Sequence, residues 1–370
     1  MIEYEEYRVA DPDSLETPAM LVFEEKVDGN INALCELVGG GENLMVHVKT
    51  HKSAAIVEKQ IAAGIAGFKC ATLKELEMVL AAGAQTAILA YQMAQRVKVE
   101  RFADLAAAYP EAHPCAVISA PLHLDLLAAV AAERQQKLEV MLDLDVGMHR
   151  TGVAVGEEGA ALYRAVGEHP HLEPAGFHVY NGHEHISDPQ AREAATQRHI
   201  RDVQKFQQEM EEQGLPVPQV VGGGSFSFAP FARTEGMHGS PGTCIYWDLG
   251  YAGGMPDMPF EWAAMVLTQV VERYPDQKTI TTDLGCKAIA GDPPLRSRAR
   301  LLGKMDAELR LQNEEHGVFY WPGELPEVGS YLLAVPGHVC PTTIRYAGSY
   351  VIDGQGEVVD FYPHTARDRQ

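Results

Sequence analysis

The 370-residue sequence predicts an α/β protein that combines a (β/α)8 barrel of the TIM type with a smaller, mostly β domain. Over the first two-thirds of the chain, short runs rich in β-branched residues alternate with longer segments whose apolar residues recur every three or four positions. Repeated strand-helix units are typical of a parallel sheet, and eight of them favour a closed barrel. After about Gly250 the helical periodicity nearly vanishes, which indicates a second domain.

Eight segments are expected to form the barrel strands, and longer amphipathic segments between them are expected to be helices. The strands are predicted at 19–23, 44–49, 66–69, 86–90, 115–118, 138–144, 175–180 and 219–222. The helices are predicted at 53–63, 72–82, 94–108, 121–134, 157–167 and 190–213. Ser53 and Thr72 are expected to cap their helices, Thr72 in a capping box with Glu75. An open doubly wound sheet is the alternative, but no Gly-x-Gly-x-x-Gly opens a helix after an early strand.

The rest of the chain has the pattern of a β domain. Strands are predicted at 266–274, 278–283, 317–321, 331–335 and 348–352, and turn pairs such as Asp353-Gly354 separate them. We therefore expect a barrel over residues 16–250. Residues 251–370 are expected to form the β domain, joined by residues 1–15, which precede the first barrel strand.

Composition and charge exclude several classes of partner. The formal net charge of −21 argues against nucleic acid and anionic membranes, because both bind clustered Lys and Arg. No apolar run reaches the length of a membrane span, and the acidic first residues lack a basic-then-apolar leader. The six cysteines have no paired spacing, so we expect buried free thiols rather than disulfides. These features predict a cytoplasmic protein.

The end of the predicted strand at 44–49 and the residues after it have the sequence His47-Val48-Lys49-Thr50-His51-Lys52. In a (β/α)8 barrel the working residues lie at the carboxyl ends of the strands and in the loops that follow. A lysine there can point into the barrel mouth, where desolvation lowers its pKa and provides the neutral amine that condenses with carbonyl groups. The alternative is a solvated basic loop. Spacing alone does not separate Lys49 from Lys52.

Two further motifs suggest ligand binding. Gly222-Gly223-Gly224-Ser225 follows the last predicted barrel strand, where a nest of backbone amides can hold a phosphate, although most glycine runs are flexible turns. His338-Val339-Cys340 places two ligand types two positions apart, so in an extended segment both project the same way. A buried thiol beside an unrelated histidine is the alternative. Thiolate ligation favours zinc over harder ions such as manganese.

The segment from His47 to Lys52 resembles the signature of the D-threonine aldolase and D-serine dehydratase family. These are fold-type III pyridoxal-phosphate enzymes related to alanine racemase. The likeness extends over nearly the whole chain, through Thr17-Pro18-Ala19, through the segment from Phe68 to Glu75 and through the segment from Leu144 to Gly152. The resemblance implies pyridoxal 5'-phosphate as cofactor, bonded by Lys49, the first of the two lysines.

The resemblance also assigns the remaining site residues. Arg150 and Tyr180 are implied beside the cofactor, and the phosphate cup is implied at Gly223, Gly224, Ser225, Gly242 and Thr243. A histidine after the tyrosine handles the substrate's β-hydroxyl group. His183 and His185 both compete for that role, because a related aldolase pattern places the histidine at Ile186. His338 and Cys340 are implied to hold a divalent metal, zinc or manganese. Some aldolases have aspartate where this chain has Cys340, whereas the dehydratases have cysteine.

The implied reaction is cleavage of a D-β-hydroxy-α-amino acid. D-Threonine aldolase, which forms glycine and acetaldehyde, is the first hypothesis, and a D-serine or 3-hydroxy-D-aspartate dehydratase is the alternative. A racemase would have no use for the metal pair. A non-catalytic pyridoxal-phosphate carrier is usually a single barrel. A phosphosugar-binding barrel explains the glycine run but not Lys49 and the metal pair together. Asp283 and Lys287 are expected to be structural. The family pattern also predicts a homodimer in which His338 and Cys340 can reach across.

Overall fold

The computed structural model describes residues 1–369, which form two compact units. The barrel unit comprises Leu34–Lys49, Ala55–Gly242 and the residues from Asp368 onward. The sheet unit comprises Met1–Ala33, Thr50–Ala54 and Thr243–Arg367. Helix α1 (Glu24–Val38), which the sequence analysis missed, carries the chain from the sheet unit into the barrel unit.

The barrel unit contains eight parallel strands that pair with one another in chain order. They are β4 (Met45–His47), β5 (Gly67–Cys70), β6 (Thr86–Leu89), β7 (His113–Ile118), β8 (Leu138–Asp145), β10 (Leu172–Val179), β11 (Val220–Gly222) and β12 (Met237–Gly239). A parallel bridge between Leu44 and Gly239 brings the last strand back to the first. The prediction of a (β/α)8 barrel is therefore confirmed.

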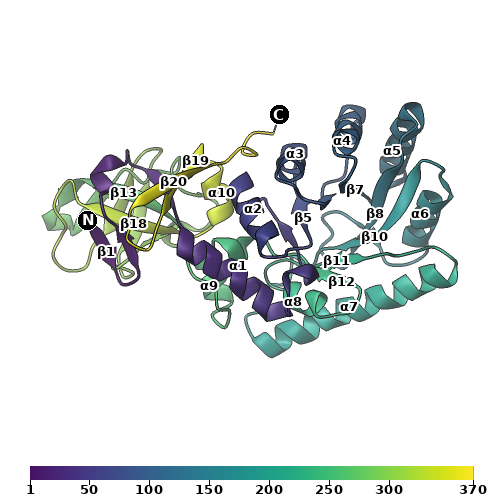
Figure 1. The fold of residues 1–370 in the computed structure, drawn as a ribbon. Helices are drawn as coiled ribbons and strands as arrows, with labels where there is room; N and C mark the ends of the chain where they lie inside the picture. The colour runs from purple at the N-terminus through teal and green to yellow at the C-terminus, as the bar shows by residue number, and fades with distance from the viewer. Residues whose placement is uncertain (370) are drawn as a thin grey trace. The chain divides into compact units, whose positions relative to one another are not determined.

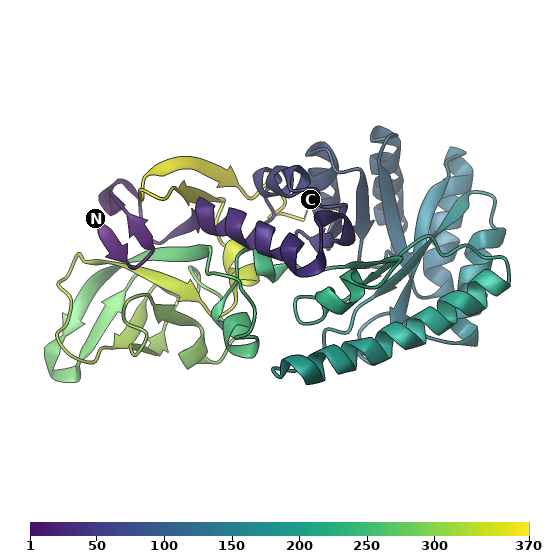
Figure 2. The same ribbon diagram turned by 60° about the horizontal axis from the view of Figure 1, so that its bottom comes forward.

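Helices cover the outside of the barrel, as the amphipathic pattern predicts. They are α2 (Ala54–Ala62), α3 (Leu73–Ala81), α4 (Arg96–Ala108), α5 (Pro121–Arg134), α6 (Glu157–Glu168), α7 (Pro189–Glu212) and α8 (Phe228–Ala232). Figure 1 shows α3, α4 and α5 in succession on this outer layer, and Figure 2 shows α7 as the longest helix of the unit. The Glu75 amide donates to the Thr72 hydroxyl, so Thr72 caps α3 as predicted. The Glu75 carboxylate accepts from the Ala71 amide.

One predicted barrel strand belongs to the other unit. β3 (Ala19–Phe23) is wholly buried and apolar, like a barrel strand, but it pairs antiparallel with β13 and parallel with β19 in the sheet unit. The prediction that it opens the barrel is wrong. The eighth barrel strand is instead β12, whose three residues are too short to show a pattern.

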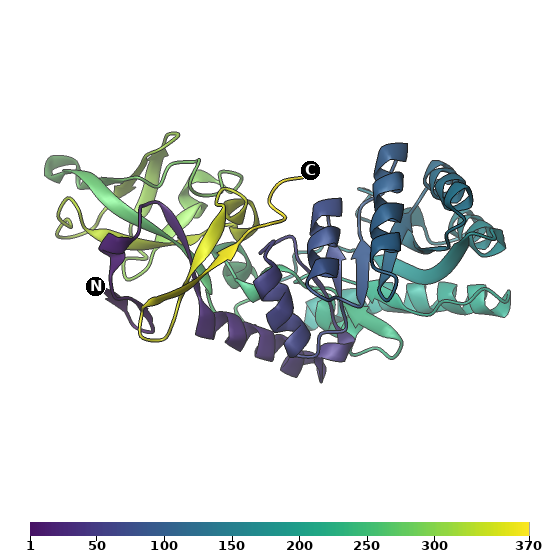
Figure 3. The ribbon, with the colours of Figure 1, turned by 45° about the horizontal axis from the view of Figure 1, so that its top comes forward.

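The sheet unit is mostly β, which confirms the prediction for the end of the chain. Its main strands are β13 (Ala264–Tyr274), β14 (Thr279–Thr282), β16 (Glu308–Gln312), β17 (Gly317–Tyr320), β18 (Tyr331–Pro336), β19 (Gly348–Ile352) and β20 (Val358–Pro363). They run in the order β16-β17-β14-β13-β3-β19-β20, and β18 pairs with β13 and with β15 (Ala299–Leu301). Figure 3 shows β20 beside β19. The first residues form a separate hairpin of β1 (Ile2–Tyr4) and β2 (Tyr7–Val9).

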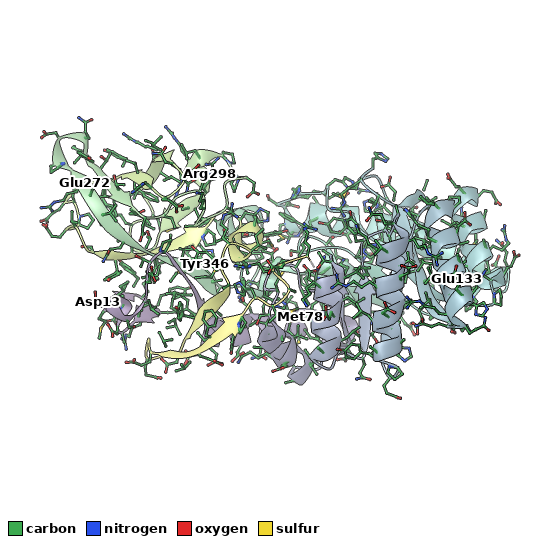
Figure 4. All side chains as sticks on the ribbon, turned by 90° about the horizontal axis from the view of Figure 1, so that it is seen from above. Asp13, Met78, Glu133, Glu272, Arg298 and Tyr346 are labelled. Carbon is green, nitrogen blue, oxygen red and sulfur yellow. The ribbon has the colours of Figure 1, made fainter. Side chains whose placement is uncertain are left out.

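Two side chains expected to be structural have structural contacts. The Asp283 carboxylate accepts from the Thr268 hydroxyl and the Gln269 amide, which joins the end of β14 to β13. Lys287 forms exposed ion pairs with Glu314 and Glu315. Figure 4 shows acidic side chains such as Glu272 projecting from the surface.

Residues 1–369 contain neither a membrane-spanning helix nor a disulfide. Their helices include none that is both long and apolar enough to cross a membrane. All six cysteines lie within this range, and none of them forms a disulfide.

Barrel closure can be tested with Ser240, which directly follows β12. Its buried hydroxyl donates to the Met45 carbonyl oxygen of β4 over 2.7 Å. We expect Ser240→Ala to lower the free energy of unfolding by about 1–2 kcal/mol in urea titrations, because it removes the bond and leaves a buried acceptor. Ser14→Ala, which removes a similar but exposed bond to the Asp11 carbonyl, should cost less than about 0.5 kcal/mol. Equal losses in both variants would contradict this account of the closure.

Candidate active site

Lys49 lies two residues beyond the end of β4 and is half-buried. The Val48 amide donates to the Lys69 carbonyl oxygen over 3.0 Å, so the segment continues alongside β5 after the strand ends. Lys52 has a different setting: it belongs to the sheet unit, is only 8% exposed, and its carbonyl oxygen accepts from the Ala366 amide. The two lysines, which spacing does not tell apart, therefore have different surroundings.

Lys69 is a third lysine that sequence reasoning did not select. It lies within β5, all of whose residues are buried, and is only 2% exposed. Burial and the nearby charges of Lys49 and Arg150 lower the pKa of Lys69 to about 7, although Asp143 acts in the opposite direction. A charged residue inside a wholly apolar strand was the signal that could have identified it.

A buried His–Asp pair lies among these cations. His178 on β10 and Asp143 on β8 are joined by a hydrogen bond of 2.6 Å between Nδ1 and Oδ1. Burial lowers the pKa of His178 despite this carboxylate. Burial alone would raise the pKa of Asp143, but the bonds from His178, Thr151 and Gln92 keep it below its usual value. Within residues 1–369, Nε2 of His178 is buried without a hydrogen-bond partner.

Tyr180 directly follows β10, and its ring is surrounded by cations and glycines. The Arg150 guanidinium lies 4.8 Å from the ring centroid and Lys69 Nζ lies 5.5 Å from it. A Cβ atom added at Gly182 or Gly224 would come within 2.3 or 2.8 Å of the ring. The two glycines are therefore needed for the ring to occupy this position.

The glycine run follows β11 and forms a tight turn. Gly223 has a φ of +78°, and its amide donates to the Val179 carbonyl oxygen. The Gly224 amide donates to the Ser227 hydroxyl, which in turn donates to Asn181 over 2.6 Å. The loop is thus held by buried polar side chains rather than being an unsupported turn.

The proposed phosphate residues divide between the units. The Gly242 amide donates to the Ser225 hydroxyl over a long 3.5 Å, so these two lie together in the barrel unit. Thr243 belongs to the sheet unit, where its buried hydroxyl lies 3.5 Å from Cys340 Sγ.

The two competing histidines follow Tyr180 on an exposed loop. His183 lies 6.2 Å from His199 of α7, measured between ring centroids. The ring of His185 packs edge-on against Phe226 at 4.9 Å. Both are exposed, so either has access to a substrate in solution.

His338 and Cys340 lie at the start of α10 (Val339–Thr343), not in the extended segment that was expected. They still face each other: burial opposes protonation, but the Cys340 sulfur and the Asp292 carboxylate raise the pKa of His338 to about 9. His338 Nδ1 lies 2.5 Å from Asp292 Oδ2. The buried Asp248 accepts from the Val339 amide over 2.9 Å and so holds the start of the helix.

The cysteine of this pair is linked through the sequence to the candidate cofactor lysine. Thr50 Oγ1 lies 3.2 Å from Cys340 Sγ, and both residues belong to the sheet unit. Thr50 is also the residue that follows Lys49 in the chain.

Comparison with protein families gives two matches along the chain. Residues 24–249 match the family described as "Alanine racemase, N-terminal domain". The chain belongs to this family. Residues 263–352 match a second model, described as "Putative serine dehydratase domain". Members of the alanine racemase-like family depend on pyridoxal phosphate, and this pair of domains agrees with the resemblance found in the sequence.

Curated relatives of this family member include both aldolases and dehydratases. A D-threonine aldolase from Arthrobacter is 26% identical over 95% of this chain and 93% of that protein. A 3-hydroxy-D-aspartate aldolase from Paracoccus denitrificans is 25% identical over 97% and 94%. A D-threo-3-hydroxyaspartate dehydratase from Delftia is 24% identical over 93% and 96%. All three are lyases, and their similar identities do not separate aldol cleavage from dehydration.

Solved structures agree on the fold. A D-threonine aldolase from Filomicrobium marinum superposes with a TM-score of 0.88 at 25% identity, covering 96% of this chain and 97% of that one. The Delftia dehydratase gives a TM-score of 0.82 at 22% identity, covering 95% and 98%.

The burial of Lys69 predicts a pH-dependent stability. The unfolded lysine keeps its proton up to pH 10.5, whereas the folded one loses it near pH 7, so the unfolded state binds more protons between these values. Stability from this group should therefore rise with pH across that window. The free energy of unfolding of the wild type and of Lys69→Met can be compared by urea unfolding of the cofactor-free chains. As the pH rises, we expect the wild type to gain stability relative to the variant by at most about 1.4 kcal/mol per pH unit. A difference that does not change with pH would contradict the buried position.

Proposed function

We propose that this chain is a pyridoxal-phosphate- and divalent-metal-dependent lyase that cleaves D-β-hydroxy-α-amino acids, in the first instance as a D-threonine aldolase. The observation that carries the proposal is the contact between Cys340 and Thr50. It ties the cysteine of a metal-type ligand pair to the residue that follows Lys49, the candidate cofactor lysine. The D-threonine aldolases among the relatives and solved structures support the same reading.

The charges of the barrel unit fit an anionic cofactor. Lys49 and Arg150 lie close enough for their charges to act on Lys69, and Asp143 is a nearby carboxylate. In a chain with a net charge of −21, such a cluster of cations suits a phosphate-bearing ligand. When bound, pyridoxal phosphate supplies an electron sink for the charge that bond cleavage leaves on the substrate's Cα.

Different residues of the barrel unit are proposed to bind different parts of this cofactor. Lys49 provides the amine that bonds it. The Ser225 hydroxyl and the Gly242 amide, whose bond to each other is long, are the groups proposed for the phosphate. Gly223 and Gly224, whose amides already donate to Val179 and Ser227, would shape the loop around it. Thr243, which follows Gly242 in the chain, is the remaining phosphate candidate of the sequence pattern.

The ring of the cofactor needs contacts of a different kind. We assign the flat ring of Tyr180 and the guanidinium of Arg150, which already stack on each other, to this part of the site.

The ligand pair fits a soft divalent ion. A thiol and an imidazole are the ligand types that zinc prefers, and manganese favours oxygen ligands instead. Asp292 contacts Nδ1 of His338 and so leaves Nε2 for the metal, in the arrangement by which a carboxylate orients a ligating histidine. A metal held there would lower the pKa of a substrate hydroxyl group.

Two outcomes are possible from the same residues. In aldol cleavage, His183 or His185 takes the proton of the β-hydroxyl, the Cα–Cβ bond breaks to release acetaldehyde, and Cα takes up a proton to give glycine. In dehydration, Lys49 takes the Cα proton and the β-hydroxyl departs with a proton as water. A water molecule then hydrolyses the resulting imine to a keto acid and ammonia. Cys340 favours the dehydratase as the second candidate, because cysteine is the dehydratase residue at this position of the family.

Product analysis separates the two candidates. The purified protein should be yellow, and incubation with D-threonine should give glycine and acetaldehyde. Pyruvate from D-serine, or oxaloacetate from 3-hydroxy-D-aspartate, would instead identify the dehydratase. Lys49→Ala should abolish both the colour and the products, while the matched variant Lys52→Ala keeps the colour. A protein that stays colourless after reconstitution with pyridoxal phosphate would overturn the proposal.

The role of Asp292 gives a quantitative prediction for the metal. Asp292→Asn should weaken zinc binding about 10- to 100-fold in competition titrations with a chromogenic chelator, because the carboxylate no longer orients His338. Asp306→Asn removes an exposed carboxylate that pairs with Lys304 in the same unit and should leave the affinity unchanged. Equal affinities for all three proteins would mean that Asp292 does not support the metal.

A further inference from the structure

A second group of ligand-type side chains lies within the barrel unit. The loop after β10 carries His183 and Glu184, and α7 contributes His199. One ligand atom from each of these three residues lies within 4.8 Å of the other two. They share no residue with the His338–Cys340 pair, and they include no thiol.

The Glu184 carboxylate is held in position from two sides. Its Oε2 atom accepts from the side-chain amide of the buried Asn181 over 2.9 Å. Its Oε1 atom lies 3.1 Å from Nε2 of His199. Asn181 in turn accepts from Ser227 of the glycine loop, so the carboxylate is part of a connected network rather than a free surface group.

The contact between Glu184 and His199 is not a hydrogen bond. Nε2 of His199 is buried and has no hydrogen-bond partner among residues 1–369, although the carboxylate oxygen is only 3.1 Å away. The oxygen therefore lies off the axis along which the ring nitrogen would form a hydrogen bond. Two ligands of one zinc ion, each about 2.0–2.2 Å from it, stand side by side in this way, with the ion on the nitrogen's axis.

We propose that His183, Glu184 and His199 form a second divalent-metal site, distinct in its residues from His338 and Cys340. Two imidazoles and one carboxylate are a ligand set that binds zinc and leaves a fourth position for water. The rings of His183 and His199 lie 6.2 Å apart at 69° to each other, and His183 lies at the surface, from which an ion can enter.

A metal at this site would join the loop after Tyr180 to α7. The metal would also occupy the ring nitrogen with which His183 would accept a proton as a general base. His185, whose ring packs against Phe226, is then the histidine left to act on a substrate. This last consequence rests on the proposed function, whereas the metal site does not.

Cobalt titration of the holoenzyme tests the site without using turnover. Bound Co²⁺ is counted by equilibrium dialysis, and its absorption spectrum separates the two ligand sets, because a cysteine thiolate adds a charge-transfer band that histidine and carboxylate lack. We expect the double variant His338→Ala/Cys340→Ala to keep one equivalent without that band. His199→Gln should lose this thiolate-free equivalent, which is the Co²⁺ ion bound without a thiolate. It should keep any Co²⁺ ion whose spectrum shows the thiolate band.

Two further variants separate metal binding from general damage to the fold. Glu184→Gln keeps the size of the side chain and should also lose the thiolate-free equivalent, with an unchanged circular dichroism spectrum. His171→Gln alters a second histidine pair, His169 and His171, whose rings are 6.1 Å apart, and should bind cobalt like the wild type. The proposal is overturned if the double variant binds no cobalt, or if His199→Gln and Glu184→Gln retain the thiolate-free equivalent at wild-type affinity.

Discussion

The cluster of Lys49, Lys69 and Arg150 is the constraint on which the barrel unit's chemistry depends. Placing three cations near one another costs electrostatic free energy, and the burial of Lys69 adds a desolvation cost. Asp143 offsets part of it, and its own charge is stabilised by His178 in a 2.6 Å hydrogen bond. A bound phosphate would offset more. This arrangement of charges is what a preorganised anion-binding site within the barrel unit would require.

The sheet unit carries His338 and Cys340 in a short segment at the start of α10. Asp248 holds the backbone of that segment and Asp292 holds the imidazole of His338, so carboxylates set both the position of the segment and the orientation of this histidine. The contact of Cys340 with Thr50 connects this pair to the chain next to Lys49. Under the proposed function, Thr50 would therefore contact one metal ligand and directly follow the cofactor lysine in the chain.

Much of the fold was predictable because the amphipathic helices of the barrel have clear periodicity and good end signals, such as the Thr72 cap of α3. The assignment of β3 failed because five buried apolar residues identify a strand but not the sheet to which it pairs. Lys49 was chosen from its place at a strand end together with the family resemblance, and its role stays a prediction. Lys69 and Asp292 were missed because their importance comes from residues distant in sequence, and a pattern of neighbours does not show that proximity.

The most direct test of the account is to find which lysine bonds the cofactor. The holoenzyme is reduced with borohydride, digested, and searched by mass spectrometry for the peptide that carries the added pyridoxyl group. The account predicts the modification on Lys49, the half-buried lysine beyond β4. Modification of Lys52 or Lys69 instead, or no modified peptide from a fully reconstituted protein, would contradict it.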